Sequence, residues 1–432
     1  MPKIQNRENL ASPAGEYPLR DHALTILESG LEAIDTEKVL RKKLTYKQGT
    51  LCIDGQDFIC HTADRIFFVG IGKCANAGAE VIEEILGDDL TEGIVVDTKT
   101  GVFKNMRSFA GTHPLPTERN IEASKAVVSM LEKATEKDLV IVFISGGGSA
   151  LLCLPHQMNC EELADITKKL MEKGADIHEV NTVRKHLSKI QGGQLAKIAY
   201  PATIISLIFS DVPGDDISVI ASGPTVPDVT TTEDAERILA KYEIRNICLK
   251  PNCEIIETPK ENGYFEKVSN LLILSNRDAL KAMKETSEKL GYDTEIVTNI
   301  LTGEAKDIGE QIANEKVGAK TCKLYGGETT VNLPEGVFGE GGRNQEFSLS
   351  ALLHINDDEL VVSCASDGRD NTDALGGIAD KTTKEKAKAN GLDPGNFLTS
   401  HTSYDFFKKT ESQIITGETG SNVSDLIIKL TK

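Results

Sequence analysis

The sequence contains no C-x-x-C pair, although it has nine cysteines among its 432 residues. Cysteines at that spacing are typical of zinc sites and redox centres, so their absence argues against both kinds of site. The cysteines are scattered and odd in number, which suits reduced thiols. His178 and His186 could share a helix face, but no cysteine or carboxylate completes a ligand set with them, so we expect no metal site there.

Long apolar runs and an excess of positive charge are also missing. No apolar stretch approaches the roughly 20 residues that cross a bilayer, and the first residues lack the apolar core of a secretory signal. We therefore expect a cytoplasmic protein that does not bind membranes. The formal net charge of −18 at pH 7 argues against nucleic acid as a partner, so a small anion would need locally placed cations.

The length indicates two domains, because 432 residues exceed what one hydrophobic core normally supports. Prolines, asparagines and charged residues between positions 248 and 263 are typical of a linker. We therefore predict one domain over residues 1–262 and a smaller one over residues 263–432.

Apolar runs alternate with helical patterns along the chain, which predicts an α/β fold with a parallel sheet covered by helices on both faces. Helices are expected near the N-terminus, over residues 121–131 and near 278–290. The expected strands are residues 65–70, 93–97, 139–144, 204–211, 271–275, 321–327 and 360–365. We expect the strand at 271–275 to begin the second domain.

The apolar run at 139–144 leads directly into Ser145-Gly146-Gly147-Gly148-Ser149. Such a run predicts a strand buried on both faces, and glycines at its carboxyl end allow backbone N–H groups to surround an anion. Gly146, Gly147, Gly148 and Ser149 are therefore candidate phosphate-binding residues. A flexible turn without a ligand is the alternative, because glycine tolerates many turn geometries.

Other polar residues follow the ends of the expected strands. Gly72-Lys73 follows the first strand, Asp97 the second and Asp211 the fourth, while Glu328 and Asp367 occupy similar positions in the second half. Open parallel sheets bind ligands at the carboxyl ends of their strands. We therefore predict that both halves contribute to a site in a cleft between the two domains.

Three of these side chains have a chemical interpretation and a structural one. Lys73 begins a helix, where its ammonium could reach a bound phosphate or simply face solvent. Arg343 follows two glycines, and its planar guanidinium suits two phosphoryl oxygens, although an ion pair with Glu340 or Glu346 is the alternative. Asp211 could bind a metal ion or accept a proton, or could end a turn or cap a helix.

A second function also fits the first strand and the loop after it. Gly70-x-Gly72-x-x-Ala75, with Asp97 further on, matches the dinucleotide fingerprint in which the acid binds a ribose hydroxyl, so a nicotinamide-dependent reductase is an alternative. Lys73, Arg343 and the second glycine loop favour phosphoryl transfer instead. No Walker A sequence is present, which excludes a P-loop NTPase. A nucleotide-binding regulator without catalysis is the third alternative.

Several motifs, in one order and over nearly the whole chain, resemble the class II glycerate 2-kinases of the MOFRL type. They are Gly72-Lys73, Gly111-Thr112-His113-Pro114, residues 145–152, residues 181–188, residues 210–215, Ala221-Ser222-Gly223-Pro224, residues 326–329, residues 341–346 and Ser366-Asp367-Gly368. The resemblance implies a Rossmann-like N-terminal domain, a C-terminal MOFRL domain and an active site in the cleft between them. It also implies transfer of the γ-phosphoryl group of ATP to the 2-hydroxyl of D-glycerate, giving 2-phosphoglycerate and ADP.

Within this resemblance we assign roles to individual residues. Gly146, Gly147, Gly148 and Ser149 are expected to bind ATP, together with Mg²⁺ or another divalent cation. The expected catalytic residues are Lys73, Arg343 and Asp211, the expected substrate-binding residues are Lys73, Arg184 and Arg343, and the expected metal ligands are Asp211 and Asp367. A homodimer is compatible with this family. An NAD(P)H-dependent hydroxypyruvate reductase is the alternative function.

The chain departs from the family pattern at three positions. Gln191 replaces a usual lysine, Asn371 a usual glycine and Cys74 a usual alanine. The change at Gln191 removes one positive charge from the expected site. The sequence therefore predicts the type of reaction more firmly than the affinity for the substrate or the range of substrates accepted.

Overall fold

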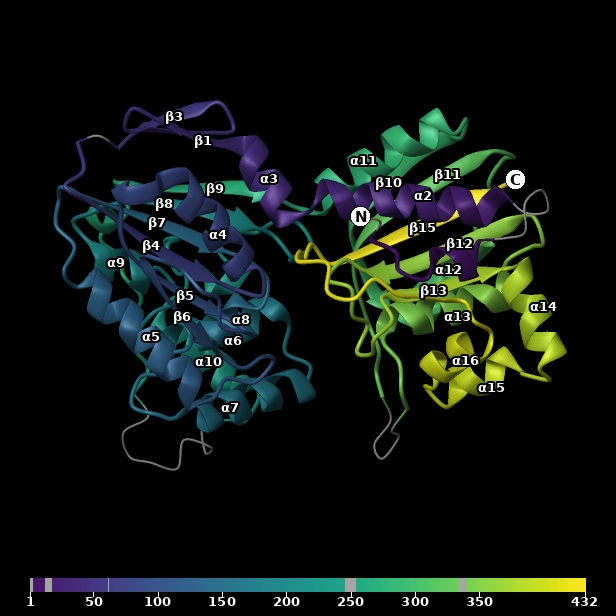
Figure 1. The fold of residues 1–432 in the computed structure, drawn as a ribbon. Helices are drawn as coiled ribbons and strands as arrows, with labels where there is room; N and C mark the ends of the chain where they lie inside the picture. The colour runs from purple at the N-terminus through teal and green to yellow at the C-terminus, as the bar shows by residue number, and fades with distance from the viewer. Residues whose placement is uncertain (1–2, 12–17, 61, 245–253, 334–338) are drawn as a thin grey trace. The chain divides into compact units, whose positions relative to one another are not determined.

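The computed structural model describes residues 3–11, 18–60, 62–244, 254–333 and 339–432 (Figure 1). The chain forms two compact units, and neither is one continuous stretch. The first unit contains Thr36–Ser210 and Asp215–Ile273, and the second contains Met1–Asp35, Asp211–Gly214 and Leu274–Lys432. Residues 248–253 of the expected linker lie outside the described ranges, and the domain boundary between residues 262 and 263 stays a prediction.

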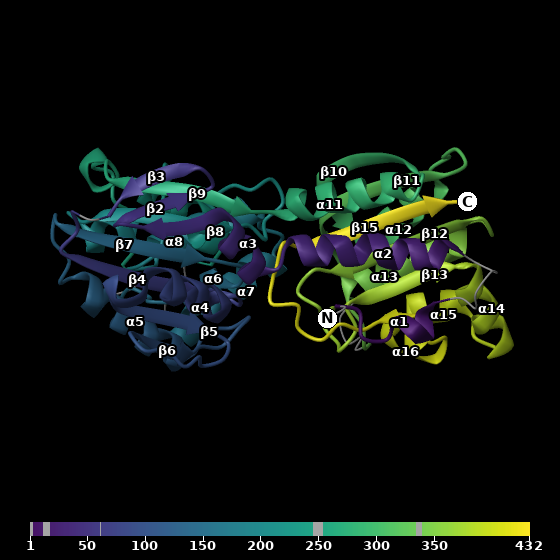
Figure 2. The same cartoon turned by 45° about the horizontal axis from the view of Figure 1, so that its top comes forward.

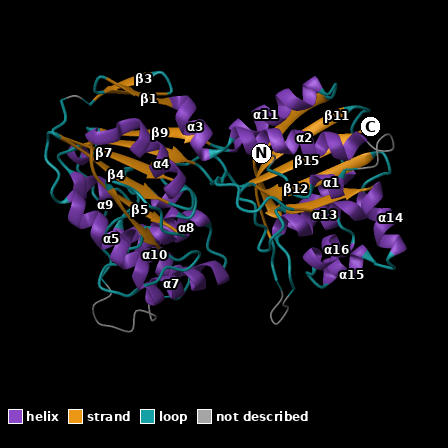
Figure 3. Ribbon diagram, in the orientation of Figure 1, coloured by secondary structure: helices purple, strands orange, loops and turns teal. Residues whose placement is uncertain are grey.

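The main sheet of the first unit has six strands in the spatial order β6-β5-β4-β7-β8-β9 (Figure 1), and Figure 3 shows its strands in orange with helices in purple beside them. The strands are β4 (Arg65–Ile71), β5 (Leu90–Asp97), β6 (Met106–Ala110), β7 (Asp138–Ile144), β8 (Thr203–Phe209) and β9 (Val268–Leu274). All pairings from β6 to β8 are parallel. Numbered along the chain, the order is 3-2-1-4-5-6, which confirms the expected Rossmann-like sheet.

The assignment of the strand near residues 271–275 to the start of the second domain is wrong. This strand is β9, and it forms the edge of the first sheet beside β8. The sequence could not show this, because a strand at the end of one sheet has the same apolar pattern as a strand that opens the next. The helix that follows it, α11 (Asn276–Lys289), confirms the expectation for residues 278–290.

Helix α4 (Ala75–Leu86) packs against β4, β5 and β7, and helix α5 (Glu118–Leu131) packs against β5 and β6. They connect β4 to β5 and β6 to β7, in opposite directions across the sheet, so right-handed crossovers place them on opposite faces. All seven residues of β7 are buried, as expected for a strand covered on both sides. The other helices are α3 (Thr36–Lys43), α6 (Gly148–Leu151), α7 (Cys160–Glu172), α8 (Ile177–His186), α9 (Gln194–Ala199) and α10 (Thr232–Lys241).

A small antiparallel sheet precedes this fold and was not expected. Its strands are β1 (Leu44–Lys47), β2 (Thr50–Ile53) and β3 (Gln56–Ile59). Two-residue turns connect them, and Gln48, Gly49, Asp54 and Gly55 all have positive φ. Positive φ at both central residues is the type I′ geometry, which matches the twist of a hairpin.

The second unit contains a mixed sheet in the order β10-β11-β15-β12-β13-β14. The strands are β10 (Asp293–Glu304), β11 (Thr321–Thr330), β12 (Glu359–Ala365), β13 (Gly376–Asp380), β14 (Gln413–Ile414) and β15 (Asp425–Thr431). The β10–β11 pairing is parallel, whereas β11–β15, β15–β12, β12–β13 and β13–β14 are antiparallel. The strands expected at 321–327 and 360–365 are confirmed as β11 and β12.

Helices cover this second sheet. The N-terminal helix α2 (Pro18–Ala33) packs along α11 and against β15 (Figure 2). It is fixed by Arg20, whose buried guanidinium contacts both carboxylate oxygens of Asp380 at 2.5 and 2.7 Å. The remaining helices are α1 (Arg7–Leu10), α12 (Ala305–Asn314), α13 (Arg343–His354), α14 (Lys381–Ala389), α15 (Pro394–Thr399) and α16 (Ser403–Lys409). In the described ranges, no helix is both long enough and apolar enough to cross a bilayer.

Candidate functional site

The loops after β4 and β7 leave the first sheet side by side. The two strands are neighbours, and their last residues, Ile71 and Ile144, are paired. The loops are also tied together, because Ser145 N–H donates to the Ile71 carbonyl at 2.8 Å and Lys73 N–H donates to the Gly146 carbonyl at 2.9 Å. The strand order reverses between β4 and β7, which is the point where open α/β sheets bind ligands.

The glycine loop, residues 145–149, presents unpaired backbone donors at this point. Within the described part of the chain, the N–H groups of Gly146, Gly147, Gly148 and Ser149 have no hydrogen-bond acceptor. Gly147 has a φ of +81°, a left-handed conformation that favours glycine. Successive N–H groups in such a turn form a concave site for an anion, as the sequence predicts.

Two side chains lie against the glycine loop at Gly147. A Cβ atom on Gly147 would be 3.0 Å from His113 Cδ2 and 3.3 Å from Lys73 Cγ. Lys73 begins the turn after β4, whereas His113 is exposed and follows β6, so residues from three strand ends meet here. We identified the His113 motif without assigning it a role, and its position directly after a strand was the available signal.

Arg184, on α8, also belongs to this cluster. Its Nη1 is 3.2 Å from Asn181 Oδ1 and 3.4 Å from Ser222 Oγ, and Ser222 Oγ is 2.9 Å from Ser149 Oγ in the glycine loop. In the described ranges Arg184 has no carboxylate partner, and burial lowers the pKa of its guanidinium. The cluster therefore holds a half-buried positive charge that no acid of the described chain neutralises, as expected of a site for an anionic ligand.

The two residues after Arg184 face a different part of the protein. Lys185 is buried and lies 3.4 Å from the carboxylate of Asp228. His186 is fully buried, with Nδ1 2.9 Å from a backbone carbonyl and Nε2 3.2 Å from Thr230 Oγ1. His178, at the other end of α8, is exposed. Of the charged residues in this motif, only Arg184 contacts the cluster around the glycine loop.

The backbone that positions Ser222 is strained. Ala221, Ser222 and Gly223 have φ values of 50°, 59° and 57°, so two residues with side chains adopt the left-handed conformation in succession. Both are buried, and a Cβ on Gly148 would lie 2.6 Å from the Ala221 Cβ. Strain of this kind costs about 1 to 3 kcal/mol per residue and persists where the surrounding structure enforces it, often at functional sites.

Gln191 holds the end of the glycine loop in place through hydrogen bonds to the backbone. Its Nε2 donates to the carbonyl of Ser149 at 2.9 Å and to that of Leu152 at 2.8 Å, and the side chain is buried. Both partners are acceptors, so this position requires a donor. The residue that replaces a usual lysine of the family therefore performs a positioning role without the positive charge.

The dinucleotide alternative is disfavoured by the geometry around Asp97. Its carboxylate is 4% exposed and accepts the N–H groups of Asn76 at 2.9 Å and Thr98 at 2.6 Å, while burial raises its pKa. The N–H groups of residues 73–76 all donate to protein acceptors. In dinucleotide-binding folds these groups contact the diphosphate and the ribose. In this structure, these N–H groups already donate hydrogen bonds to acceptors of the protein.

Arg343 lies in the second unit, at the first position of α13. Its Nε and Nη2 contact both carboxylate oxygens of Asp425, at 2.6 and 2.9 Å, and its Nη1 lies 2.8 Å from Glu328 Oε1. These acids raise the pKa of Arg343. The alternative of an ion pair with Glu340 or Glu346 is wrong, because Arg343 pairs with Asp425 and Glu328 instead. Glu346 instead lies 2.9 Å from His401 Nδ1.

A second buried acid, Asp370, caps the same helix. Its carboxylate accepts the N–H groups of Asn344 at 3.1 Å and Gln345 at 2.8 Å. Asn344 Nδ2 also donates to Asp425 at 2.9 Å, so Asp370, Asn344, Asp425 and Arg343 form one network. Burial, with the negative charge of Asp425 nearby, raises the pKa of Asp370 to about 6.

Asp211 and Asp367 converge on the chain segment that leads into β15. Asn422 Nδ2 lies 3.4 Å from Asp211 Oδ2, and the Ser424 hydroxyl donates to the Asp211 carbonyl. Thr419 N–H donates to the Asp367 carbonyl at 3.2 Å. Because this segment ends at Asp425, the partner of Arg343, the structure groups three predicted site residues of the second unit around residues 419–425. Sequence reasoning missed this segment, whose polar residues follow no expected strand.

The donor set of Asp211 and Asp367 is compatible with magnesium. Carboxylate oxygens are the protein ligands that Mg²⁺ prefers, and this ion is usually held by one or two carboxylates while water and phosphate oxygens complete its shell. In the described residues, no group of three or more histidine, cysteine or acidic side chains could hold a metal ion. That Asp211 and Asp367 hold a magnesium ion stays a prediction.

The predicted site residues are divided between the two units. Lys73, Arg184 and the glycine loop belong to the first unit, and Arg343, Asp211 and Asp367 belong to the second. That the two groups meet in a cleft between domains stays a prediction.

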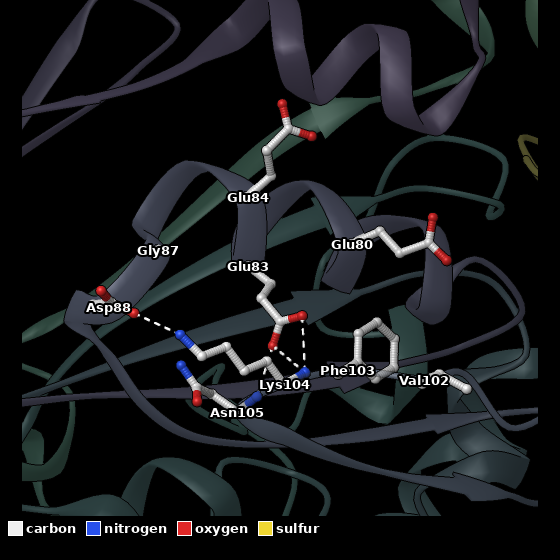
Figure 4. A pocket seen from close by; sticks show the side chains of 9 residues that line it. All are labelled: Glu80, Glu83, Glu84, Gly87, Asp88, Val102, Phe103, Lys104 and Asn105. Carbon is white, nitrogen blue, oxygen red and sulfur yellow. Dashed lines mark hydrogen bonds and ion pairs between the residues drawn. The ribbon is translucent and has the colours of Figure 1, made fainter.

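A separate pocket of about 270 Å³ lies beside the β6 edge of the first sheet, between the end of α4 and the loop that precedes β6 (Figure 4). Glu83 accepts the N–H groups of Lys104 and Asn105, at 3.0 and 2.8 Å, and Lys104 Nζ lies 2.7 Å from Asp88. These charges are paired with each other. None of the residues that line this pocket belongs to the candidate site.

Two family models match the chain. Residues 22–253 match a domain of unknown function, DUF4147, and residues 321–425 match the MOFRL family. The glycerate 2-kinase of Pyrococcus horikoshii is 38% identical, covering 95% of this chain and 97% of the relative. The D-glycerate 2-kinase of Thermotoga maritima is 35% identical over 95% of this chain and 98% of the relative.

Solved structures agree with this relationship. The crystal structure of a glycerate kinase from Thermotoga maritima matches with a TM-score of 0.82 and 34% identity, covering 96% of this chain and 99% of the other.

Two proteins of Agrobacterium vitis, 35% and 36% identical over 84% of this chain, carry hydroxypyruvate reductase in their names. Because the DUF4147 and MOFRL models both match it and full-length relatives are more than 30% identical to it, this chain belongs to the glycerate kinase family.

Proposed function

We propose that this protein is an ATP-dependent glycerate 2-kinase, which transfers the γ-phosphoryl group of ATP to the 2-hydroxyl of D-glycerate. The observation that carries the proposal is the glycine loop at the reversal point of a Rossmann-like sheet. Its unpaired N–H groups and the unneutralised Arg184 form a site for anions in a chain of net charge −18. The names of the full-length relatives point to the same reaction.

Phosphate binding is assigned to the first unit. The N–H groups of Gly146, Gly147, Gly148 and Ser149 would contact phosphate oxygens, and Lys73 would reach them from the neighbouring loop. His113 borders the same space. Arg184, next to Ser149 and Ser222, would bind the carboxylate of glycerate or a phosphate group through its planar donor pair.

Arg343 is assigned to the stabilisation of the migrating phosphoryl group. Its bidentate contact with the buried Asp425 fixes the guanidinium, whereas Glu328, 42% exposed in its side chain, pairs only with Nη1. An anionic substrate can displace an exposed carboxylate more readily than a buried bidentate one, because the exposed pair contributes little free energy. We therefore expect the Nη1 side of Arg343 to face the substrate.

Asp211 and Asp367 would hold a magnesium ion that accompanies ATP, and this ion would neutralise charge on the phosphates. Asp211 is also our choice for the general base that accepts the proton of the 2-hydroxyl. Domain closure would bring Lys73 and Arg343 together and exclude water that otherwise hydrolyses ATP.

The proposal is tested by incubating the purified protein with ATP, Mg²⁺ and D-glycerate, and separately with NADH and hydroxypyruvate. We expect ADP to form only when glycerate is present, and the phosphorus NMR spectrum of the product to show phosphate on the 2-position. Oxidation of NADH without ADP formation would instead establish the reductase. Absence of both reactions, with retained binding of ATP, would favour the regulator.

Three finer expectations accompany this proposal. The scattered cysteines favour the cytoplasm as the site of action. A homodimer stays a prediction, which sedimentation of the purified chain would test. The breadth of substrates depends on Gln191, since a neutral amide stands where many relatives in this family are expected to carry a charge.

A further inference from the structure

Two cysteine side chains of the first unit are in direct contact. The sulfur atoms of Cys153 and Cys160 lie 3.6 Å apart, and both residues are only 2% exposed. Among the described cysteines, no other pair has sulfur atoms in contact. The loop between the two residues is six residues long, so the pair belongs to one local turn of the chain.

The environment of Cys160 favours a reactive thiolate. Cys160 is the first residue of α7, where the positive end of the helix dipole stabilises a negative charge. The contact between the two sulfurs lowers the pKa of Cys160 and raises that of Cys153, and the Cys160 thiol also lies 3.4 Å from the Thr117 carbonyl oxygen, which can accept its hydrogen bond. Cys160 is buried, whereas its chain neighbours Asn159 and Glu161 are exposed.

We propose that Cys153 and Cys160 are a redox modification site that forms a reversible intramolecular disulfide in the presence of a hydroperoxide. The Cys160 thiolate attacks one peroxide oxygen, the O–O bond breaks, and with hydrogen peroxide the leaving hydroxide takes up a proton to become water. The Cys153 sulfur then attacks the sulfenic acid, forms the S–S bond and releases a second water. The two thiols lose two electrons, and the peroxide gains them.

The pair is coupled to the glycine loop through two contacts. Cys153 directly follows Leu152, whose carbonyl is held by Gln191 together with that of Ser149. The charge of Arg184 also acts on the Cys153 thiol, lowering its pKa against the stronger effect of Cys160. A disulfide requires the sulfurs to approach from 3.6 Å to about 2.05 Å, through rotation of the two side chains together with movement of the chain at Cys153 or at the start of α7.

This movement would displace the glycine loop, and misplacement on that scale lowers turnover substantially. We infer that the disulfide reduces phosphoryl transfer about tenfold. This second step rests on the proposed function, whereas formation of the disulfide does not.

The full chain is treated with a small excess of hydrogen peroxide, digested under non-reducing conditions and analysed by mass spectrometry. We expect a peptide that joins Cys153 to Cys160, two hydrogens lighter than the reduced form, and its disappearance after treatment with dithiothreitol. Cys52→Ser, which removes the more exposed Cys52, is the matched control and should leave this product unchanged. A disulfide through other cysteines, or both sulfurs remaining reduced while Cys52 is oxidised, would overturn the proposal.

The variants Cys160→Ser and Cys160→Ala keep Cys153, and either one should abolish the linked peptide. The thermal unfolding midpoints of these variants show whether they fold. If neither variant folds, the peptide mapping of the unmodified chain still tests the proposal. Kinase activity is measured in parallel before oxidation, after oxidation and after reduction. Disulfide formation with unchanged turnover would overturn the coupling to the loop, whereas a reduced protein without kinase activity would contradict the proposed function and leave the peptide result intact.

Discussion

Arg343 donates hydrogen bonds to both oxygens of the buried carboxylate of Asp425, from Nε at 2.6 Å and from Nη2 at 2.9 Å. The two residues are 82 positions apart, at the start of α13 and the start of β15. The contact fixes the direction of the guanidinium while leaving Nη1 against the exposed Glu328. The same arginine is therefore both a structural partner and the candidate for contact with the phosphoryl group.

Replacing Arg343 should affect turnover and stability through different partners. Arg343→Ala should lower kcat by about 10³-fold, which corresponds to about 4 kcal/mol of lost transition-state stabilisation. It also leaves Asp425 buried without its cation, which should cost about 3 to 5 kcal/mol of folding free energy. Steady-state kinetics and urea unfolding measure the two effects.

The double variant Arg343→Ala with Asp425→Asn separates these roles. It removes the unpaired buried charge, so the unfolding midpoint should partly recover while kcat stays low. Recovery of near-full turnover in the double variant would show that Arg343 acts only as a structural partner.

Arg184 should show the opposite relation between stability and activity. Partial burial of its guanidinium without a carboxylate partner in the described chain costs free energy, so Arg184→Met should raise the free energy of unfolding, by up to about 1 kcal/mol. The same change should raise the KM for glycerate or ATP about tenfold or more, because a charge-assisted contact to an anion is lost. Kinetics and urea unfolding of the same preparation test both effects.

Arg237→Met is the matched control for Arg184. Arg237 is 73% exposed in its side chain and pairs with Asp234 on the surface of α10. Such a change should alter stability by less than about 0.5 kcal/mol and leave KM unchanged. If Arg184→Met behaved like this control in the kinetic assay, Arg184 would not contact the substrates.

Gly147→Ala and Gly174→Ala form a pair with nearly equal backbone conformations, since their φ values are 81° and 83°. Both should lose about 1 kcal/mol of stability, because alanine is strained in the left-handed region. A Cβ on Gly147 meets the His113 ring at 3.0 Å, whereas nothing lies within 4 Å of a Cβ on Gly174. We therefore expect a loss of ATP affinity in the first variant only, measured by titration calorimetry. Equal affinities in the two variants would place the nucleotide elsewhere.

Asp370 should contribute a pH dependence to stability. Burial raises its pKa in the folded protein from 3.8 to about 6, so the folded state holds this proton more tightly than the unfolded state does. The stabilisation is then fully present below about pH 4 and is lost as the pH rises through about 6. The loss is on the order of 2 to 3 kcal/mol.

Asp370→Asn removes the titrating group, so the difference in unfolding free energy between the unmodified chain and this variant should change between pH 4 and pH 7 by that amount. Urea unfolding followed by circular dichroism across this range measures it. A difference that is independent of pH would contradict the assignment.

Several strands could be predicted from sequence because their apolar runs are local. The run at 139–144 is β7, and the glycines after it leave their N–H groups unpaired within the described chain, as that pattern indicates. The hairpin β1–β2–β3 was missed although Asp54-Gly55 is a strong type I′ turn signal. The strand β15 was also missed, and with it Asp425, the partner that fixes Arg343.

The partners of the candidate site could not be predicted, because they depend on contacts between distant segments. For Arg343, the alternative to contact with a phosphoryl group was an ion pair with the nearby Glu340 or Glu346, whereas β15 brings Asp425 to it from 82 positions away. Asp97 matched the dinucleotide fingerprint. Its carboxylate is buried, however, and accepts hydrogen bonds from the backbone of Asn76 and Thr98, so it is not available to bind a ribose hydroxyl. Spacing in the sequence does not report whether a carboxylate is exposed.

The sequence by itself determined the α/β class, the main strands of the first sheet and the glycine loop at the end of β7, because period, apolar content and glycine act within a few residues of chain. Only the tertiary structure decided the strand order, the place of β9 in the first sheet and of α2 in the second unit, and which charged groups are paired. Those features arise from burial and hydrogen bonding between segments far apart in the chain, and no local pattern encodes which segments will meet.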